Sequence, residues 1–80
     1  MNAVDRLLGL SFADIVVSKT IYGKITVHYQ YAYIKDGGLL IGTFGDGGTF
    51  EEACENYLKK ISGKTLVFDF PNHKKEVTVL

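Results

Sequence analysis

The strongest structural signal in the sequence is a short amphipathic helix with a defined first residue. Thr49 and Glu52 have the spacing of a capping box, in which the threonine hydroxyl accepts a hydrogen bond from the backbone N–H three residues later. Apolar side chains then recur at helical spacing, and Gly63 follows as a helix terminator. This stripe consists of Phe50, Ala53, Cys54, Tyr57, Leu58 and Ile61. The sequence therefore predicts a helix from about Thr49 to Ile61 that buries one face.

The clearest alternation of apolar and polar residues lies between Lys24 and Lys35, which predicts one long strand. One face would carry Ile25, Val27, Tyr29, Tyr31 and Tyr33, and the other Thr26, His28, Gln30 and Ala32. Asp36-Gly37 is typical of a tight hairpin turn. We therefore expect the segment from Leu39 to Phe44 to return as the antiparallel neighbour of the long strand.

Three further strands are predicted at Ala13 to Thr20, Thr65 to Phe70 and Glu76 to Leu80, the last at a sheet edge. Asn2 is placed to cap a first short helix that ends near Leu8. The predicted fold is α+β, a mostly antiparallel sheet of about five strands in the order α-β-β-β-α-β-β, with one main helix packed on one face. A chain of 80 residues predicts a single domain, residues 1–80.

Composition excludes several classes of protein. Nine basic and nine acidic side chains cancel, which argues against a general binder of phosphate backbones. The single cysteine, Cys54, cannot form an intramolecular disulfide. No apolar run approaches the roughly 20 residues of a membrane span, and the first residues lack the pattern of a signal peptide. These observations predict a cytoplasmic protein with no membrane partner. Because a small domain buries little surface, a homo-oligomer remains open.

Catalytic chemistry has weak support in the sequence. The Gly45 to Gly48 segment before the helix resembles a phosphate-binding loop, but it has no P-loop lysine and no dinucleotide fingerprint. A tight connection is the favoured interpretation, with a nucleotide at this loop left open. Cys54 lies in the apolar stripe, where a buried thiol is expected. With His28 and His73 it shows no zinc spacing. We therefore predict no catalytic residue, no metal, no cofactor and no enzymatic activity.

Two surfaces are candidates for binding. The tyrosines of the long predicted strand either pack under the helix as core or form an exposed aromatic platform for a base or a protein. Lysines near the helix end would form a basic region if the last turn folds back beside it: Lys59, Lys60, Lys64, Lys74 and Lys75. An acidic region would contain Asp46, Glu51, Glu52 and Glu55. The predicted partner-binding residues are Tyr29, Tyr31, Tyr33, His28, Gln30, Lys59, Lys60 and Lys64.

The stretch from Asp36 to Leu58 resembles the strand–loop–helix core of HicB-like antitoxins, which have a glycine turn, an aliphatic strand and Thr-x-Glu-Glu-Ala opening a helix. The matching positions are Gly37, Gly38, Thr49, Glu51, Glu52 and Ala53. The chain also resembles small accessory proteins of bacteriophages, through Thr49 to Ala53 and the Gly63 to Val67 segment that follows the helix.

These resemblances imply a function that composition and periodicity do not reach. The phage proteins bind and neutralise bacterial defence components, including CRISPR effector nucleases. The expected function is therefore a non-enzymatic inhibitor that binds a host defence nuclease, or a toxin in the antitoxin variant, in the bacterial cytoplasm. A module that binds nucleic acid or a nucleotide signal is the alternative.

Overall fold

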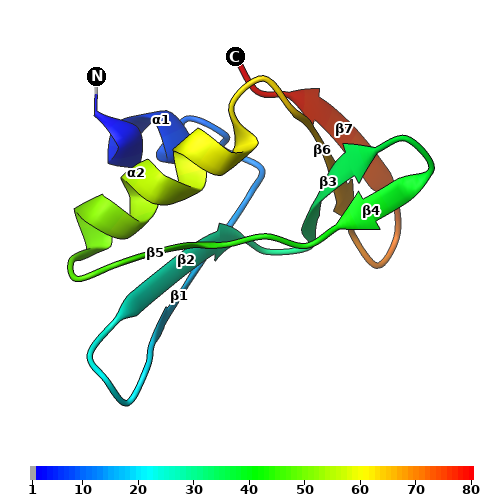
Figure 1. The fold of residues 1–80 in the computed structure, drawn as a ribbon. Helices are drawn as coiled ribbons and strands as arrows, with labels where there is room; N and C mark the ends of the chain where they lie inside the picture. Colours follow the sequence, from blue (N-terminus) through cyan, green and yellow to red (C-terminus); the bar gives the residue numbers. More distant parts are fainter. Residues whose placement is uncertain (1) are drawn as a thin grey trace.

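The computed structural model describes residues 2–80 and has the predicted α+β class (Figure 1). These described residues form seven strands instead of the predicted number of about five. The elements are α1 (Ala3–Leu8), β1 (Ile15–Lys19), β2 (Ile25–Tyr29), β3 (Ala32–Asp36), β4 (Leu39–Ile41), β5 (Gly45–Gly47), α2 (Phe50–Ile61), β6 (Thr65–Asp69) and β7 (Lys74–Thr78). Neither helix of residues 2–80 is long and apolar enough to cross a bilayer.

The strands form two separate antiparallel sheets in place of the single predicted one. The first has the order β1-β2-β5, and the second has the order β4-β3-β6-β7. Helix α2 packs mainly on β5 and β2 of the first sheet, with α1 beside it (Figure 1). The second sheet lies at the other end of the molecule, and its strand β7 is an edge, as predicted for the last strand. Side chains from β6 complete the core under α2.

Both helix starts follow the sequence prediction. The Glu52 N–H donates to Thr49 Oγ1 at 3.1 Å, and the Asp5 N–H donates to Asn2 Oδ1 at 2.9 Å. Each side-chain oxygen satisfies one of the backbone donors that a first helical turn leaves free. The main helix ends at Ile61, two residues before Gly63 adopts a φ of 75°. The predicted helix from Thr49 to Ile61 is therefore confirmed, with Thr49 as its cap.

The predicted long strand from Lys24 to Lys35 is wrong, because the chain turns a corner at residues 30–31. Tyr31 has a φ of 67°, a left-handed conformation that costs a non-glycine residue roughly 1–2 kcal/mol. Two long-range backbone bonds hold the corner: the Gln30 N–H donates to the Asp14 carbonyl at 2.8 Å, and the Asp69 N–H donates to the Tyr31 carbonyl at 3.0 Å. The corner passes the chain from the first sheet to the second, so the three tyrosines no longer share one face.

The predicted glycine-rich loop is also wrong in part, because Gly45–Gly47 forms strand β5, paired with β2. Both glycines are buried against the first turns of α2. A Cβ at Gly45 would collide with the Ala53 carbonyl and the Tyr57 backbone nitrogen. The glycines therefore serve close packing of a helix against a strand backbone, rather than the unusual φ values of a loop.

A pair of tyrosines forms the polar centre of the core. Tyr29 and Tyr57 are 2% and 1% exposed, and their rings meet edge to face with centroids 5.7 Å apart. The Tyr29 hydroxyl donates to the Leu7 carbonyl at 2.6 Å, and the Tyr29 N–H donates to Tyr57 Oη at 3.1 Å. The first bond ties β2 to α1, and the second ties β2 to α2. The pair therefore joins three elements whose contacts are otherwise apolar.

We predict that Gly45→Ala lowers the free energy of unfolding by about 3 kcal/mol, because the added methyl group collides with backbone atoms of α2 and the helix would have to shift. Urea denaturation followed by circular dichroism measures the change. Gly48→Ala is the matched control, since a Cβ there meets nothing within 4 Å. Equal stability of the two variants would contradict the described packing of α2 on β5.

We also predict that stability falls as pH rises above about 10, the ordinary pKa of tyrosine. Burial raises the pKa of Tyr29, with further contributions from Tyr57 and Cys54, and burial also raises the pKa of Tyr57. Above pH 10 the unfolded chain therefore releases protons that the folded chain retains, which favours unfolding. Urea denaturation between pH 8 and about pH 11 measures the slope. Tyr29→Phe should give a shallower slope, and parallel slopes would contradict the assignment.

Candidate functional site

The most distinctive surface feature is an opening within a long two-stranded ribbon. At one end of this ribbon Val27 pairs with Gly45, and at the other Ile34 pairs with Ile41. Between these pairs, six residues of one side (28–33) face only three of the other (42–44). The longer side follows the corner at Tyr31, so the two sides separate. The ribbon therefore contains a gap where strand pairing is interrupted.

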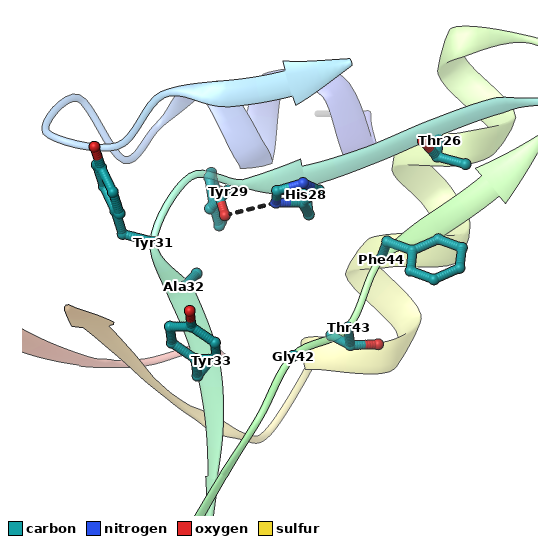
Figure 2. A pocket seen from close by; sticks show the side chains of 9 residues that line it. All are labelled: Thr26, His28, Tyr29, Tyr31, Ala32, Tyr33, Gly42, Thr43 and Phe44. Atoms are coloured by element: carbon teal, nitrogen blue, oxygen red, sulfur yellow. Dashed lines mark hydrogen bonds between the residues drawn. The ribbon is translucent and has the colours of Figure 1, made fainter. Parts of the chain in front are cut away.

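This gap is a groove of about 380 Å³ (Figure 2). The volume lies at the lower end of the range found for small-ligand sites, about 300–1,000 Å³. We call it the aromatic groove, and it is lined by Thr26, His28, Tyr29, Tyr31, Ala32, Tyr33, Gly42, Thr43 and Phe44. Figure 2 shows that these residues come from β2, the corner and β3 on one side and from the connection between β4 and β5 on the other.

Three partly exposed aromatic rings surround the groove. Tyr31, Tyr33 and Phe44 are 42%, 38% and 49% exposed. The Tyr31 ring packs edge to face on Phe70 at 5.8 Å between centroids, which fixes one side of it while leaving the other open. Such rings lose little conformational entropy when they bind, and they contribute much of the energy in protein interfaces. The groove can therefore accept an apolar or aromatic group.

The polar groups of the groove are few. His28 Nδ1 lies 2.9 Å from the Tyr29 carbonyl, which accepts only, so Nδ1 carries a proton and the neutral ring keeps Nε2 as an acceptor. Within residues 2–80, the backbone groups of Gly42 and Thr43 make no hydrogen bond. The groove therefore offers the hydroxyls of Thr26, Thr43, Tyr31 and Tyr33, the imidazole of His28 and the free backbone groups of Thr43. No lysine, arginine, aspartate or glutamate is among its lining residues within residues 2–80.

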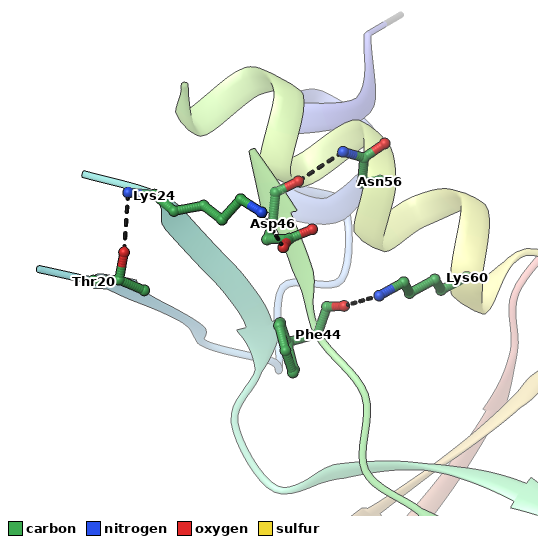
Figure 3. Close-up of polar contacts among 6 residues, drawn as sticks. All are labelled: Thr20, Lys24, Phe44, Asp46, Asn56 and Lys60. Carbon is green, nitrogen blue, oxygen red and sulfur yellow. Dashed lines mark hydrogen bonds and ion pairs between the residues drawn. The ribbon is translucent and has the colours of Figure 1, made fainter. Parts of the chain in front are cut away.

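The ribbon segment that borders the groove is supported from outside by α2 (Figure 3). Asn56 Nδ2 donates to the Asp46 carbonyl at 2.6 Å, and Lys60 Nζ donates to the Phe44 carbonyl at 2.8 Å. Lys60 also lies 5.2 Å from the centre of the Phe44 ring. Asp46 of β5 in turn forms an ion pair of 3.2 Å with Lys24, the residue directly before β2. These contacts hold the wall of the groove in place.

The predicted binding residues are divided by the structure. Tyr31, Tyr33 and His28 line the groove with their side chains, whereas Tyr29 is core and its ring is not available to a partner. Gln30 is half-buried at the corner, where its backbone pairs with Asp14. The three tyrosines therefore do not share one environment: Tyr29 is part of the core, whereas Tyr31 and Tyr33 are on the surface.

The predicted basic region does not form as one cluster. Lys59, Lys60 and Lys64 are exposed near the end of α2. Strand β6 then leads away from the helix. At the helix end of the β6–β7 hairpin, the Val79 N–H donates to the Lys64 carbonyl, and at the far end Asp69 is paired with Lys74. Lys74 and Lys75 therefore lie at the opposite end of the β6–β7 hairpin, and Lys75 Nζ lies 4.1 Å from the centre of the Phe12 ring. The turn does not fold back beside the helix.

The candidates for catalysis have no active geometry. Cys54 is completely buried, and burial, with a smaller effect of Glu51, raises the pKa of its thiol, which disfavours the reactive thiolate. The glycines proposed as a phosphate loop are paired in β5 under α2. Within residues 2–80, no three His, Cys, Asp or Glu side chains are grouped so as to hold a metal ion.

Gly42, Thr43 and Phe44 were not predicted as groove residues. The sequence pattern instead predicts that they end a regular strand paired with the long strand. The signal that creates the groove is the left-handed corner at Tyr31, and neither glycine nor asparagine marks that position. The partners that hold the corner come from Asp14 and Asp69, which are distant in the sequence.

Comparison of the chain with known protein families, with curated proteins and with solved structures found no match.

We predict that Cys54 of the native protein reacts with a water-soluble disulfide reagent only when the chain unfolds, because the thiol is buried in the core. The rate at which the reagent releases its own thiol, followed by absorbance, should rise across the urea transition. Val17→Cys, at an exposed position of β1, provides the control for a rapid reaction. Fast reaction of both thiols without denaturant would show that the helix stripe is accessible.

Proposed function

We propose that this chain is a non-enzymatic inhibitor that binds a partner protein at the aromatic groove. The observation that carries the proposal is the strained corner at this groove: Tyr31 is the non-glycine residue with positive φ within residues 2–80, and it lines the opening. Left-handed non-glycine residues are enriched at binding and active sites, because the fold must compensate for their cost. At this corner the left-handed backbone of Tyr31 exposes the tyrosine side chain and separates the two sides of the ribbon.

The chemistry of the groove favours a protein side chain as its occupant. The three exposed rings and the aliphatic neighbours on β4 offer an apolar surface, and His28 with two threonine hydroxyls offers a few directional hydrogen bonds. Interfaces combine these features, with aromatic anchors surrounded by polar groups. The wall formed by Phe44 is fixed by Lys60, so little ordering is needed on binding.

The class of partner comes from the resemblance to phage accessory proteins and HicB-like antitoxins. In that proposal the partner is a bacterial defence component such as a CRISPR effector nuclease, or in the antitoxin variant a small RNase toxin. The place of action is the cytoplasm of the bacterial host cell. Of the lysines predicted as binding residues, Lys60 bonds to the Phe44 carbonyl on the wall of the groove, whereas Lys59 and Lys64 are exposed near the end of α2. These charges would guide an acidic partner surface.

A nucleobase is the second candidate occupant, because Tyr31 and Tyr33 offer ring faces and the volume suits a small ligand. Phosphate recognition would need a cation at the groove, and no lysine or arginine lines it. Lys60 is the cation that the structure places on its wall, and this side chain bonds to the Phe44 carbonyl. A protein partner is therefore the preferred assignment.

We predict that the purified chain inhibits target cleavage by a CRISPR effector nuclease in a panel of such enzymes. In that assay the double variant Tyr33→Ala, Phe44→Ala should inhibit at least tenfold more weakly, a loss of about 1.4 kcal/mol. Removal of two exposed rings takes away binding surface but leaves the core intact. Tyr22→Ala, at a tyrosine that is 90% exposed on the β1–β2 turn, is the matched control and should inhibit normally.

The result that would overturn the groove assignment is inhibition that the double variant retains in full. Failure to inhibit any nuclease or RNase toxin of the panel would overturn the proposed class of partner. A parallel salt titration with single-stranded oligonucleotides and common nucleotides tests the second candidate. Binding that needs Tyr33 and weakens with salt would favour the nucleotide over the protein.

A further inference from the structure

Each of the two sheets has two edges, and three of the four edges are protected. Strand β7 carries Lys74, Lys75 and Glu76. Strand β5 is covered by α2, whose side chains donate hydrogen bonds to the carbonyls of Phe44 and Asp46. Strand β1 has a charged residue at each end, with Asp14 directly before it and Lys19 as its last residue. Charged side chains and covering helices are the usual means of preventing unwanted strand pairing.

Strand β4 has no such protection. Its three residues, Leu39, Leu40 and Ile41, are 67%, 45% and 43% exposed. Within residues 2–80, β4 pairs with β3 alone and ends the second sheet. It contains no charge and no proline, and a glycine lies on each side, Gly38 and Gly42. An uncharged apolar edge of this kind is a template for another strand.

The direction of the backbone groups follows from the turn. A two-residue turn, Gly37-Gly38, joins Asp36 and Leu39, so these two residues face each other as a hydrogen-bonded pair. Since such pairs alternate along an antiparallel ladder, the N–H and C=O of Leu40 point away from β3. The same alternation points Gly42 outward. The carbonyls of Phe44 and Asp46, which α2 covers, continue this series.

The occupant that fits this edge is a second copy of the same edge. The segment Gly-Leu-Leu-Ile-Gly, residues 38–42, is nearly symmetric about Leu40. In antiparallel pairing about a two-fold axis at Leu40, each Leu40 faces its equivalent, Leu39 faces Ile41 and Gly38 faces Gly42. The paired segments contain no charged residue, and the chain has no net charge, so two copies approach without overall repulsion.

We infer that two copies of this chain form a symmetric dimer through antiparallel pairing of β4, which joins the two four-stranded sheets into one continuous sheet. The Leu40 N–H of each copy donates to the Leu40 carbonyl of the other. Twofold symmetric contacts of this kind use the same patch on both subunits. Strand β4 has only three residues, so the contact is small, and we expect a weak dimer that forms at micromolar concentrations or above.

Sedimentation equilibrium of the purified full chain, from low micromolar to high micromolar concentrations, tests the inference. The natural sequence should shift from monomer to dimer over this range. Leu40→Lys should raise the dissociation constant at least tenfold, because two ammonium groups would face each other across the axis. Val17→Lys, at a comparably exposed apolar position of β1, is the matched control and should dimerise normally.

Cross-linking tests the register. In a hydrogen-bonded antiparallel pair the Cα atoms are about 5.5 Å apart, which suits a disulfide. Leu40→Cys should therefore form a covalent dimer on mild oxidation much faster than Val17→Cys. The natural thiol is buried and does not compete. A chain that stays monomeric at high micromolar concentration, with equal cross-linking of the two variants, would overturn the dimer. So would a dimer that Leu40→Lys leaves unchanged.

These outcomes are independent of the groove. The groove lies on the inner side of residues 42–44, between the two halves of the ribbon, whereas the dimer edge is the outer side of β4. A monomeric Leu40→Lys variant that still inhibits a nuclease would support the dimer edge and the groove separately. Protection of the Leu40 amide from hydrogen exchange should rise with protein concentration alone, and protection that requires an added partner protein would overturn the second copy as occupant.

Discussion

The close approach of α2 to β5 is the constraint on which the rest of the fold depends. Because Gly45 and Gly47 have no side chains, the helix lies directly on the strand backbone. This distance allows Tyr57 to reach past the strand and accept a hydrogen bond from the Tyr29 N–H. It also places Asn56 and Lys60 beside the outer edge of β5. A larger residue at Gly45 would disturb the core, the edge and the wall of the groove together.

The two sheets are a consequence of the corner at Tyr31. A regular hairpin through this region would give one continuous sheet with all three tyrosines on one face. The left-handed residue instead diverts the chain, so that β3 pairs with β6 while β2 remains with β1 and β5. The diversion also interrupts pairing in the ribbon, and the groove is the space that remains. Fold and candidate site therefore have one origin, which is a local backbone conformation held by long-range bonds.

Local signals in the sequence predicted local structure well. The capping oxygens of Thr49 and Asn2 act within three residues, so both helix starts could be predicted. The glycine turn after Asp36 likewise predicted the β3–β4 hairpin. The corner could not be predicted, because the backbone bonds that hold it come from Asp14 and Asp69, which are distant in the sequence. Tyr31 and Tyr33 were predicted as binding residues, whereas Phe44 was missed, since its exposure depends on the same corner.

The hydrogen bonds from Asn56 and Lys60 to the ribbon have a consequence for the partly unfolded chain. They occupy backbone carbonyls on a strand edge, so that α2 protects this edge from pairing with another strand, as charged side chains do on β7. Fraying of the last two turns of α2 would uncover that edge beside the bare β4, giving an uncharged stretch from Leu39 to Gly45. An unpaired, uncharged strand edge is a template for pairing with another chain. We therefore expect that loss of these turns would lengthen the edge that is open to pairing with another chain, from three residues to seven.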